Sequence, residues 1–276
     1  MSIQLATTER VALAKRHYYE CCLCEHRCRV RRTAERQGRC RAAAEAHVYR
    51  HRIEWGEELE LIPSHLFYLS GCDLRCDFCI GGADAFDASR GRTLSGVWLA
   101  EAVNWGTRHG ARNIQWVGGE PTIHLPAILE AMAACEDLPP VVWKSNFHGT
   151  PAAFDLLDGI VDVYVADFKF GNNGCARRLA GIQQYVEIVT RNLAIAAGQA
   201  DLIVRHLLMP GHDECCFRPV VQWMAEHLPA TKFSIRDGFL PRWRAARHAE
   251  LARPLPIDRS DWARHLALEH GLRLVR

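Results

Sequence analysis

Three cysteines in the stretch SGCDLRCDFCIGG, residues 70–82, constrain this chain more than any other feature. Cys72, Cys76 and Cys79 follow the spacing C-x3-C-x2-C, after an apolar run at 66–69 and before two glycines. This pattern predicts a strand that ends in a metal-binding loop. A structural tetrahedral site closes with four protein ligands, so a zinc site here would need a distant Cys or His. Three thiolates alone suit a [4Fe-4S] cluster whose fourth iron has no protein ligand.

The length and composition indicate a globular protein of a reducing compartment. With 276 residues the chain can bury a full core as one large domain, alone or with a small module. No apolar run approaches the roughly 20 residues of a membrane span, and residues 1–20 carry scattered charges instead of a signal core. We therefore expect a cytoplasmic protein without a membrane partner. The 12 cysteines then indicate metal binding or catalysis instead of disulfides.

A second group of cysteines lies near the N-terminus. Cys21, Cys24, Cys28 and Cys40 are spaced C-x2-C-x3-C-x11-C. Four thiolates at such spacing can close a site of their own, either a structural zinc site or a second iron–sulfur cluster. We expect residues 1–60 to form a helix and this Cys-rich module, and residues 61–276 to form the main domain.

The Cys-rich module also supports a different class of function. It is rich in arginine, and a basic surface can bind nucleic acid or an acidic partner. The alternative is therefore a metal-stapled RNA- or protein-binding module without redox chemistry. Aromatic residues for base stacking are sparse and acidic residues balance the arginines, so nucleic acid is the less favoured partner.

From residue 64 on, apolar strand candidates alternate with helical stretches. The strands are expected at 65–70, 113–117, 141–145, 161–168, 202–208 and 232–236, with a short last strand at 272–275. The helices are expected at 96–108, 125–135, 151–157, 174–197 and 216–227. Six such units predict an α/β fold of the partial (β/α)6 TIM-like barrel type, with a doubly wound open sheet as the alternative.

Polar residues gather where the predicted strands end, which is where such folds carry their chemistry. The second strand ends in Gly118, Gly119 and Glu120. The glycines allow a ligand to approach the backbone, and the carboxylate can accept hydrogen bonds from an ammonium group. The third strand ends in Ser145 and Asn146, which could bond a ribose hydroxyl or serve only as turn residues.

The fourth and fifth strands end in charged residues. Asp167 and Lys169 share one face of a strand, and Arg205 follows on the next. Because a buried charge must be paired, Asp167 and Lys169 serve each other or a ligand. Arg205 could bind a ligand carboxylate, or it could form an internal ion pair with Asp167.

Several longer motifs occur in a fixed order over residues 18–225. They are CCLCEHRC, SGCDLRCDFC, WVGGEPTIHLP, VVWKSN, LLDGIVDVYVADFKFGN and LIVRHLLMPGHDECC. Together they resemble the radical SAM superfamily, and within it the pyruvate formate-lyase-activating-enzyme-like, PflX-like branch. Phe78 occupies the aromatic position of the C-x3-C-x-aromatic-C signature. The resemblance implies that the cluster binds S-adenosylmethionine (SAM) through its open iron and that Glu120 holds the amino group of SAM.

The resemblance also implies a reaction. A reduced [4Fe-4S] cluster would pass one electron to SAM, giving methionine and a 5′-deoxyadenosyl radical that abstracts a hydrogen atom from the substrate. The electron would come from a reduced flavodoxin or ferredoxin-type donor. Asp167, Lys169 and Cys216 are the catalytic candidates, since a thiol near the mouth of the barrel could donate a hydrogen atom to a radical.

The chain departs from that branch where we expect the substrate to sit. Residues 80–82 read Ile-Gly-Gly in place of Gln-Asn, residues 147–149 read Phe-His-Gly in place of Met-Tyr, and the chain beyond residue 236 does not match. The substrate is therefore left unassigned as a small molecule, peptide or protein, with a glycyl-radical activase as one instance.

Overall fold

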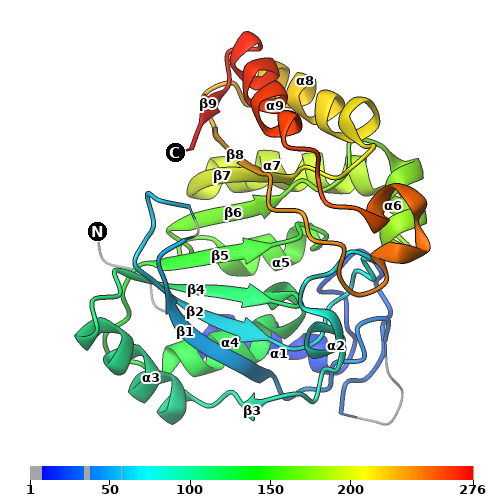
Figure 1. Cartoon of the computed structure of the whole chain (residues 1–276). Helices are drawn as coiled ribbons and strands as arrows, with labels where there is room; N and C mark the ends of the chain where they lie inside the picture. The colour runs from blue at the N-terminus through cyan, green and yellow to red at the C-terminus, as the bar shows by residue number, and fades with distance from the viewer. Residues whose placement is uncertain (1–7, 34–37, 57, 276) are drawn as a thin grey trace.

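A computed structural model describes residues 8–33, 38–56 and 58–275. These residues form a nine-stranded sheet in the order β3-β1-β2-β4-β5-β6-β7-β8-β9 (Figure 1). The strands are β1 His47–Glu54, β2 Ser64–Leu69, β3 Arg92–Thr93, β4 Asn113–Gly118, β5 Val141–Ser145, β6 Val163–Asp167, β7 Asp201–Leu207, β8 Lys232–Arg236 and β9 Arg273–Leu274. Strand β2 and strands β4 to β9 run parallel, whereas β1 pairs antiparallel with both β2 and β3.

Most helices lie outside the sheet and connect the parallel strands (Figure 1), whereas the first precedes β1 and the second follows the cysteine loop. The helices are α1 Thr8–Lys15, α2 Gly82–Phe86, α3 Gly96–Arg108, α4 Leu125–Ala133, α5 Pro151–Leu157, α6 Asn173–Ala180, α7 Tyr185–Gln199, α8 Arg218–His227 and α9 Asp258–Glu269. Short helical turns are η1 Arg16–Tyr18, η2 Pro121–His124, η4 Ala245–Arg247 and η5 Ala249–Ala252, and η3 Asp213–Phe217 is a π-helix. The parallel strands neighbour one another in chain order, whereas a doubly wound sheet reverses its order part-way. The fold is therefore a partial TIM-like barrel, as predicted.

The structure differs from the sequence prediction in several elements, and α2, β3 and α9 have no counterpart in the prediction. The single helix expected at 174–197 is two helices, because α6 ends at Gly181 in the left-handed conformation (φ 70°) and α7 begins anew. The N-terminal helix over residues 1–20 is α1 followed by η1, and residues 1–7 lie outside the described part. Strand β1 was not expected: it lies within the predicted module of residues 1–60 and pairs with β2. The boundary between module and barrel near residue 60 stays a prediction.

The two faces of the central strands differ in what they bury. Trp116, Trp143 and Tyr164 are fully buried among the large side chains of the main core, which includes residues of the covering helices. On the opposite face Val142 and Val165 form a separate small cluster with neighbouring strands. Side chains two residues further along each strand share that face and lie nearer the carboxyl ends. The barrel interior thus has an apolar floor with polar groups above it.

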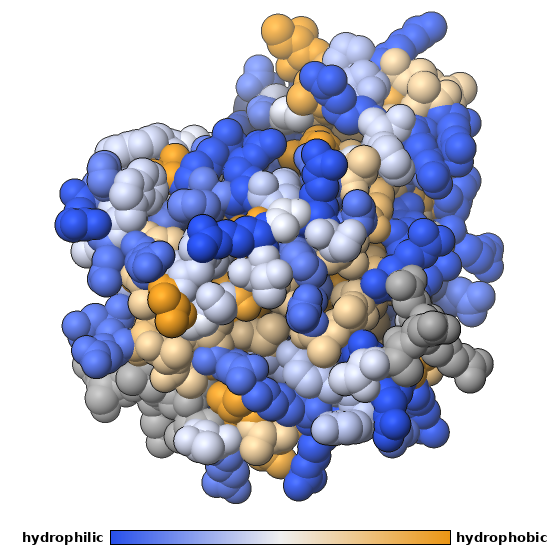
Figure 2. All heavy atoms as spheres, turned by 90° about the horizontal axis from the view of Figure 1, so that it is seen from below, coloured by the Kyte–Doolittle hydropathy of each residue, from blue (hydrophilic) through white to orange (hydrophobic). Residues whose placement is uncertain are grey.

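Hydrophilic side chains predominate on the face shown in Figure 2, where apolar residues form small groups between them. Among the described residues, no helix has both the length and the apolar character needed to cross a membrane.

Candidate active site

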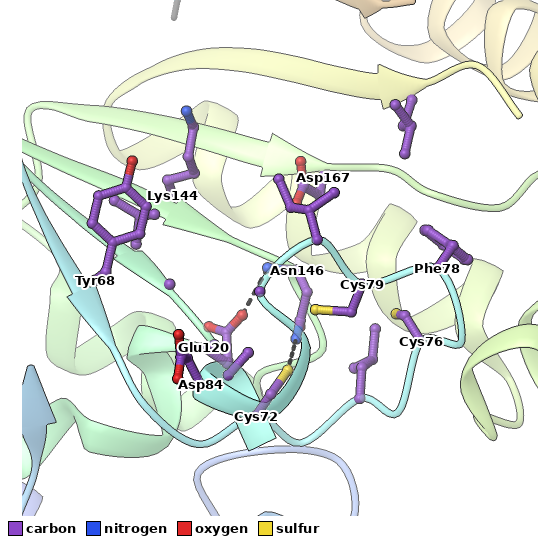
Figure 3. A pocket seen from close by; sticks show the side chains of 18 of the residues that line it. Tyr68, Cys72, Cys76, Phe78, Cys79, Asp84, Glu120, Lys144, Asn146 and Asp167 are labelled. Carbon is purple, nitrogen blue, oxygen red and sulfur yellow. Dashed lines mark hydrogen bonds between the residues drawn. The ribbon is translucent and has the colours of Figure 1, made fainter. Parts of the chain in front are cut away.

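A cavity of about 460 Å³ opens at the carboxyl ends of the parallel strands. Its lining includes Cys72, Cys76 and Cys79 from the loop after β2, together with Glu120 and Asn146 that follow β4 and β5. Figure 3 shows the thiols and the carboxylate in this one region, with hydrogen bonds that join Asn146 to Glu120 and to Cys72. A cavity of this size fits a cofactor-sized ligand.

The cysteine loop is fixed by backbone hydrogen bonds to a distant helix. The amide nitrogens of Arg75 and Asp77 donate to the carbonyls of Ala180 and Leu179 at the end of α6, at 3.1 and 2.9 Å. Burial raises the pKa of the Cys76 thiol to about 12. A metal must therefore displace the protons of such buried thiols when it binds, as thiolate coordination does.

Asp73, which the sequence analysis did not single out, ties the cysteine loop to the end of β5. It is fully buried, and its two carboxylate oxygens accept from Asn146 Nδ2 at 2.7 Å and face His148 Nδ1 at 2.8 Å. Burial alone would raise the pKa of Asp73, but these partners outweigh it and hold the pKa below its usual value. The carboxylate thus positions Asn146 beside Cys72.

Glu120 is buried in the cavity wall with its carboxylate held by three donors. Oε1 accepts from the backbone of Thr122 at 3.0 Å and from Ser145 Oγ at 2.8 Å, and Oε2 accepts from the backbone of Asn146 at 2.8 Å. A carboxylate has about four acceptor sites, so one remains for a ligand. Burial and the charge of Asp73 raise the pKa of Glu120 to about 7.

The two glycines before Glu120 are required by the packing of the chain on itself. Gly118 has φ +114°, and a Cβ there would lie 2.3 Å from the backbone nitrogen of Leu69. A Cβ on Gly119 would lie 1.8 Å from the carbonyl oxygen of Gly71, at the start of the cysteine loop. The glycines therefore allow the end of β4 to pack against the cysteine loop. They also leave space for a ligand to approach the backbone.

A row of charged side chains lies above the apolar floor of the barrel. Asp167 pairs with Lys169 at 2.5 Å and with Arg205 at 2.6 Å, so the structure contains the internal ion pairs that were one of the two alternatives for these residues. Lys144 Nζ lies 3.1 Å from Glu58, whose other oxygen is 3.8 Å from Arg205. Burial would raise the pKa of Asp167, but the charges of Arg205 and Lys169 hold it far below its usual range. The sequence analysis did not predict the place of Glu58 in this row.

The comparisons with known proteins agree with this site. A model of the radical SAM superfamily matches residues 66–224, more than half of the chain. The chain belongs to the radical SAM superfamily. Its members are enzymes that use a [4Fe-4S] cluster and SAM, which favours this chemistry over the binding-module alternative.

Two relatives illustrate the similarity. The uncharacterized protein MJ0674 of Methanocaldococcus jannaschii is 33% identical over 273 residues, which cover 96% of this chain and 79% of that protein. Streptococcus suis SuiB bound to S-adenosylmethionine matches 74% of this chain at a TM-score of 0.56 and 13% identity. SuiB bound to its precursor peptide SuiA gives a TM-score of 0.55 at the same identity and coverage of this chain. The match spans about half of the length of SuiB, 46–47%, and shows a shared fold.

Other residues predicted for radical SAM chemistry lie in different places. Phe78 lines the cavity and packs edge-on against Phe170, with ring centroids 5.9 Å apart. Cys216 is buried and is not among the residues that line the cavity, so the geometry offers no support for it as a hydrogen-atom donor. Of the three departures expected at the substrate, Ile80 and, beyond residue 236, Phe239 line the cavity, but Phe147 is wholly buried in the core with φ +58°. The expectation for Phe147 was therefore wrong.

The four N-terminal cysteines of the predicted module lie close together. Cys21, Cys24, Cys28 and Cys40 line one small cavity of about 10 Å³, and their role as metal ligands stays a prediction. Arg32 is buried beside this cavity, with Nη2 3.7 Å from Cys40 Sγ.

Proposed function

We propose that this protein cleaves SAM reductively at a [4Fe-4S] cluster held by Cys72, Cys76 and Cys79, and so abstracts a hydrogen atom from a substrate. One observation carries the proposal: the thiols of Cys72, Cys76 and Cys79 and the carboxylate of Glu120 line the same cavity. Three thiolates leave one iron of a cluster for an outside ligand, and SAM is that ligand in this superfamily. The cluster and SAM supply the 5′-deoxyadenosyl radical, while the protein binds, orients and excludes water.

Glu120 is our candidate for the amino group of SAM. Its carboxylate is preorganised by hydrogen bonds from Ser145 and from the backbone of Asn146. These two residues were predicted to contact the ribose; their hydrogen bonds support a positioning role toward Glu120 as well. Gly118 and Gly119 keep the end of β4 close to the cysteine loop, so one SAM molecule can contact both Glu120 and the open iron of the cluster.

The charged row contains cationic side chains that could bind a carboxylate of SAM or of the substrate. Arg205 and Lys169 both line the cavity, and both are already oriented by Asp167. Guanidinium groups bind carboxylates well because their donors match the two oxygens. We propose Arg205 for the carboxylate of SAM, with Lys169 and Asp167 facing the substrate. The substrate itself is a small molecule, peptide or protein.

We further propose that Cys21, Cys24, Cys28 and Cys40 hold a second metal centre, zinc or iron–sulfur. The order of the motifs over residues 18–225 supports the PflX-like branch. All 12 cysteines are free thiols, which fits a reducing, cytoplasmic setting, and we propose a reduced flavodoxin or ferredoxin-type protein as the electron donor.

SAM turnover tests the proposal directly. The chain should be reconstituted with iron and sulfide without oxygen, reduced with dithionite and incubated with SAM. We expect equal amounts of 5′-deoxyadenosine and methionine, because one C–S bond is broken per electron delivered. If the purified protein takes up only zinc and leaves SAM intact under these conditions, the proposed function is wrong.

SAM affinity should depend on pH through Glu120. The raised pKa of about 7 means that the carboxylate becomes protonated as the pH falls through that value. Only the carboxylate attracts an ammonium, so affinity should fall by up to about tenfold per pH unit below it. Above about pH 8 the α-amino group of SAM loses its own proton, so affinity should peak between the two values.

Calorimetric titration of the reconstituted protein at several pH values measures this effect. Glu120→Gln should bind SAM more weakly and lose the acidic limb of the profile, because its amide does not titrate. An acidic limb of the same shape in Glu120→Gln would show that another group is responsible.

A further inference from the structure

Four side chains outside the cavity converge on one point. They are Cys175 of α6 and His212, Cys215 and Cys216 in the segment that follows β7, with all their ligand atoms within 4.8 Å of one another. The Sγ atom of Cys215 lies 3.8 Å from that of Cys175 and 4.0 Å from that of Cys216. His212 Nδ1 lies 3.4 Å from Cys215 Sγ and 3.5 Å from Cys216 Sγ.

These spacings match the edges of a tetrahedron around one metal ion. With Zn–S bonds of about 2.3 Å and Zn–N bonds of about 2.0–2.1 Å, tetrahedral angles place two sulfurs about 3.8 Å apart and a sulfur and a nitrogen about 3.6 Å apart. The four measured separations fall within a few tenths of an ångström of these values. A disulfide would need a sulfur–sulfur distance of about 2.05 Å, so the thiols are not bonded to one another.

The local backbone explains how two adjacent cysteines face the same point. The π-helix η3 brings the amide nitrogens of both Cys216 and Phe217 to the carbonyl of His212, at 3.0 and 3.1 Å. On the other side, a Cβ on Gly171 would lie only 2.4 Å from the carbonyl oxygen of Cys216. This close approach brings the start of α6, and with it Cys175, against η3.

The surroundings resemble the supporting groups of a metal site. Asn172 Nδ2 points at two of the sulfurs, 3.2 Å from Cys175 and 3.8 Å from Cys216, and such donors stabilise thiolates. His212 Nε2 lies 3.4 Å from Arg178 Nη2 and 3.7 Å from a carboxylate oxygen of Glu250, and the carboxylate is the one of these two groups that can accept the Nε2 proton when Nδ1 binds a metal. Arg178 in turn donates to the same carboxylate at 2.6 Å.

We propose that Cys175, His212, Cys215 and Cys216 bind one Zn²⁺ in a closed Cys3His site. Four protein ligands fill a tetrahedral zinc, which gives the ion a structural role, and binding releases the thiol protons to solvent. Cys216, buried and away from the cavity, thereby gains a role as a ligand. The site does not depend on the proposed function.

The position of the site indicates what the zinc stabilises. It fastens the N-terminal end of α6 to η3, while the carbonyls of Leu179 and Ala180 at the other end of α6 accept from Asp77 and Arg75. The zinc therefore fixes the helix on which the loop with Cys76 rests. Loss of the ion should loosen that loop before it affects the far side of the barrel.

Metal analysis of the full chain tests the proposal. Zinc and iron per chain should be measured in protein grown with added zinc, for the wild type, for Cys175→Ser/Cys215→Ser and for Cys135→Ser. Cys135 is a matched control, since its buried thiol only donates to the carbonyl of Ala131. We expect the double variant to lose one zinc per chain and Cys135→Ser to lose none. Equal zinc in both variants would overturn the proposal.

A second measurement covers the case in which the double variant fails to fold. In Cys24→Ser/Cys28→Ser the N-terminal centre is broken, so the remaining zinc should report the proposed site. Zinc X-ray absorption should show three sulfurs at about 2.3 Å and one nitrogen at about 2.0–2.1 Å. Absence of zinc, a shell of four sulfurs, or a disulfide between Cys175 and Cys215 in anaerobically purified protein would each contradict the assignment.

Discussion

Replacement of Cys76 by alanine is expected to abolish SAM cleavage and to leave the protein folded. The thiol is buried in the lining of the cavity and is one of only three in the C-x3-C-x2-C loop. Two thiolates cannot hold a [4Fe-4S] cluster in place, and SAM then has no reduced centre to receive an electron from. Production of 5′-deoxyadenosine should fall below detection, with a matching loss of iron, while the far-ultraviolet circular dichroism stays unchanged.

Cys135→Ala provides the control for this variant. It also removes a buried thiol, but from the end of α4, and the core there should tolerate the small change. Iron content and SAM cleavage should match the wild type. Undiminished SAM cleavage by Cys76→Ala would refute the assignment of the cluster ligands, and equal losses in both variants would point to general destabilisation.

The predicted site residues that the structure brings together are those whose sequence signals are local. The spacing of Cys72, Cys76 and Cys79 lies within one short loop, and the apolar strands alternate with helices in regular order. Period-two alternation also placed Asp167 and Lys169 on one face, where the structure pairs them. Such signals depend on neighbours in the chain, so they can be recognised without knowledge of the fold.

The residues that were missed act through distant partners. Asp73 follows a cluster cysteine, but its role appears only when β5 brings His148 and Asn146 against it. Glu58 stands in an acidic run, EELE, with nothing to distinguish it from the exposed Glu60. The proposed zinc site likewise combines Cys175 with residues about 40 positions later in the chain, among them Cys215. Patterns of local spacing carry no information on such contacts.

The close packing at Gly118 and Gly119 also depends on partners that are distant in the sequence. The pattern GGE predicted an approach of ligand to backbone at Gly118 and Gly119. In the structure the backbone that approaches belongs to the chain itself, at Leu69 and Gly71. The sequence indicates that another group must approach these two glycines closely. Which group approaches depends on the pairing of β2 with β4.

Loss of the buried charge of Glu58 should destabilise the barrel strongly. Its side chain is fully buried and faces Lys144 at 3.1 Å and Arg205 at 3.8 Å. Glu58→Gln keeps the shape but removes the negative charge, which leaves the two cations with less compensation in a desolvated setting. Breaking a buried pair in this way costs about 3 kcal/mol or more. For a chain of this size we expect Tm of the reconstituted protein to fall by about 10 °C.

Glu60→Gln is the matched control, because it lies two residues away in the same segment and pairs with Lys232 at the surface. Both partners of that pair are well exposed, so its loss should cost less than about 1 kcal/mol. A fall in Tm for Glu58→Gln that is no larger than that for Glu60→Gln would mean that the contacts of Glu58 with Lys144 and Arg205 do not stabilise the fold. A large fall in Tm confined to Glu58→Gln would show that the buried charge of Glu58 stabilises the charged row, in which Asp167 and Arg205 are oriented toward the cavity.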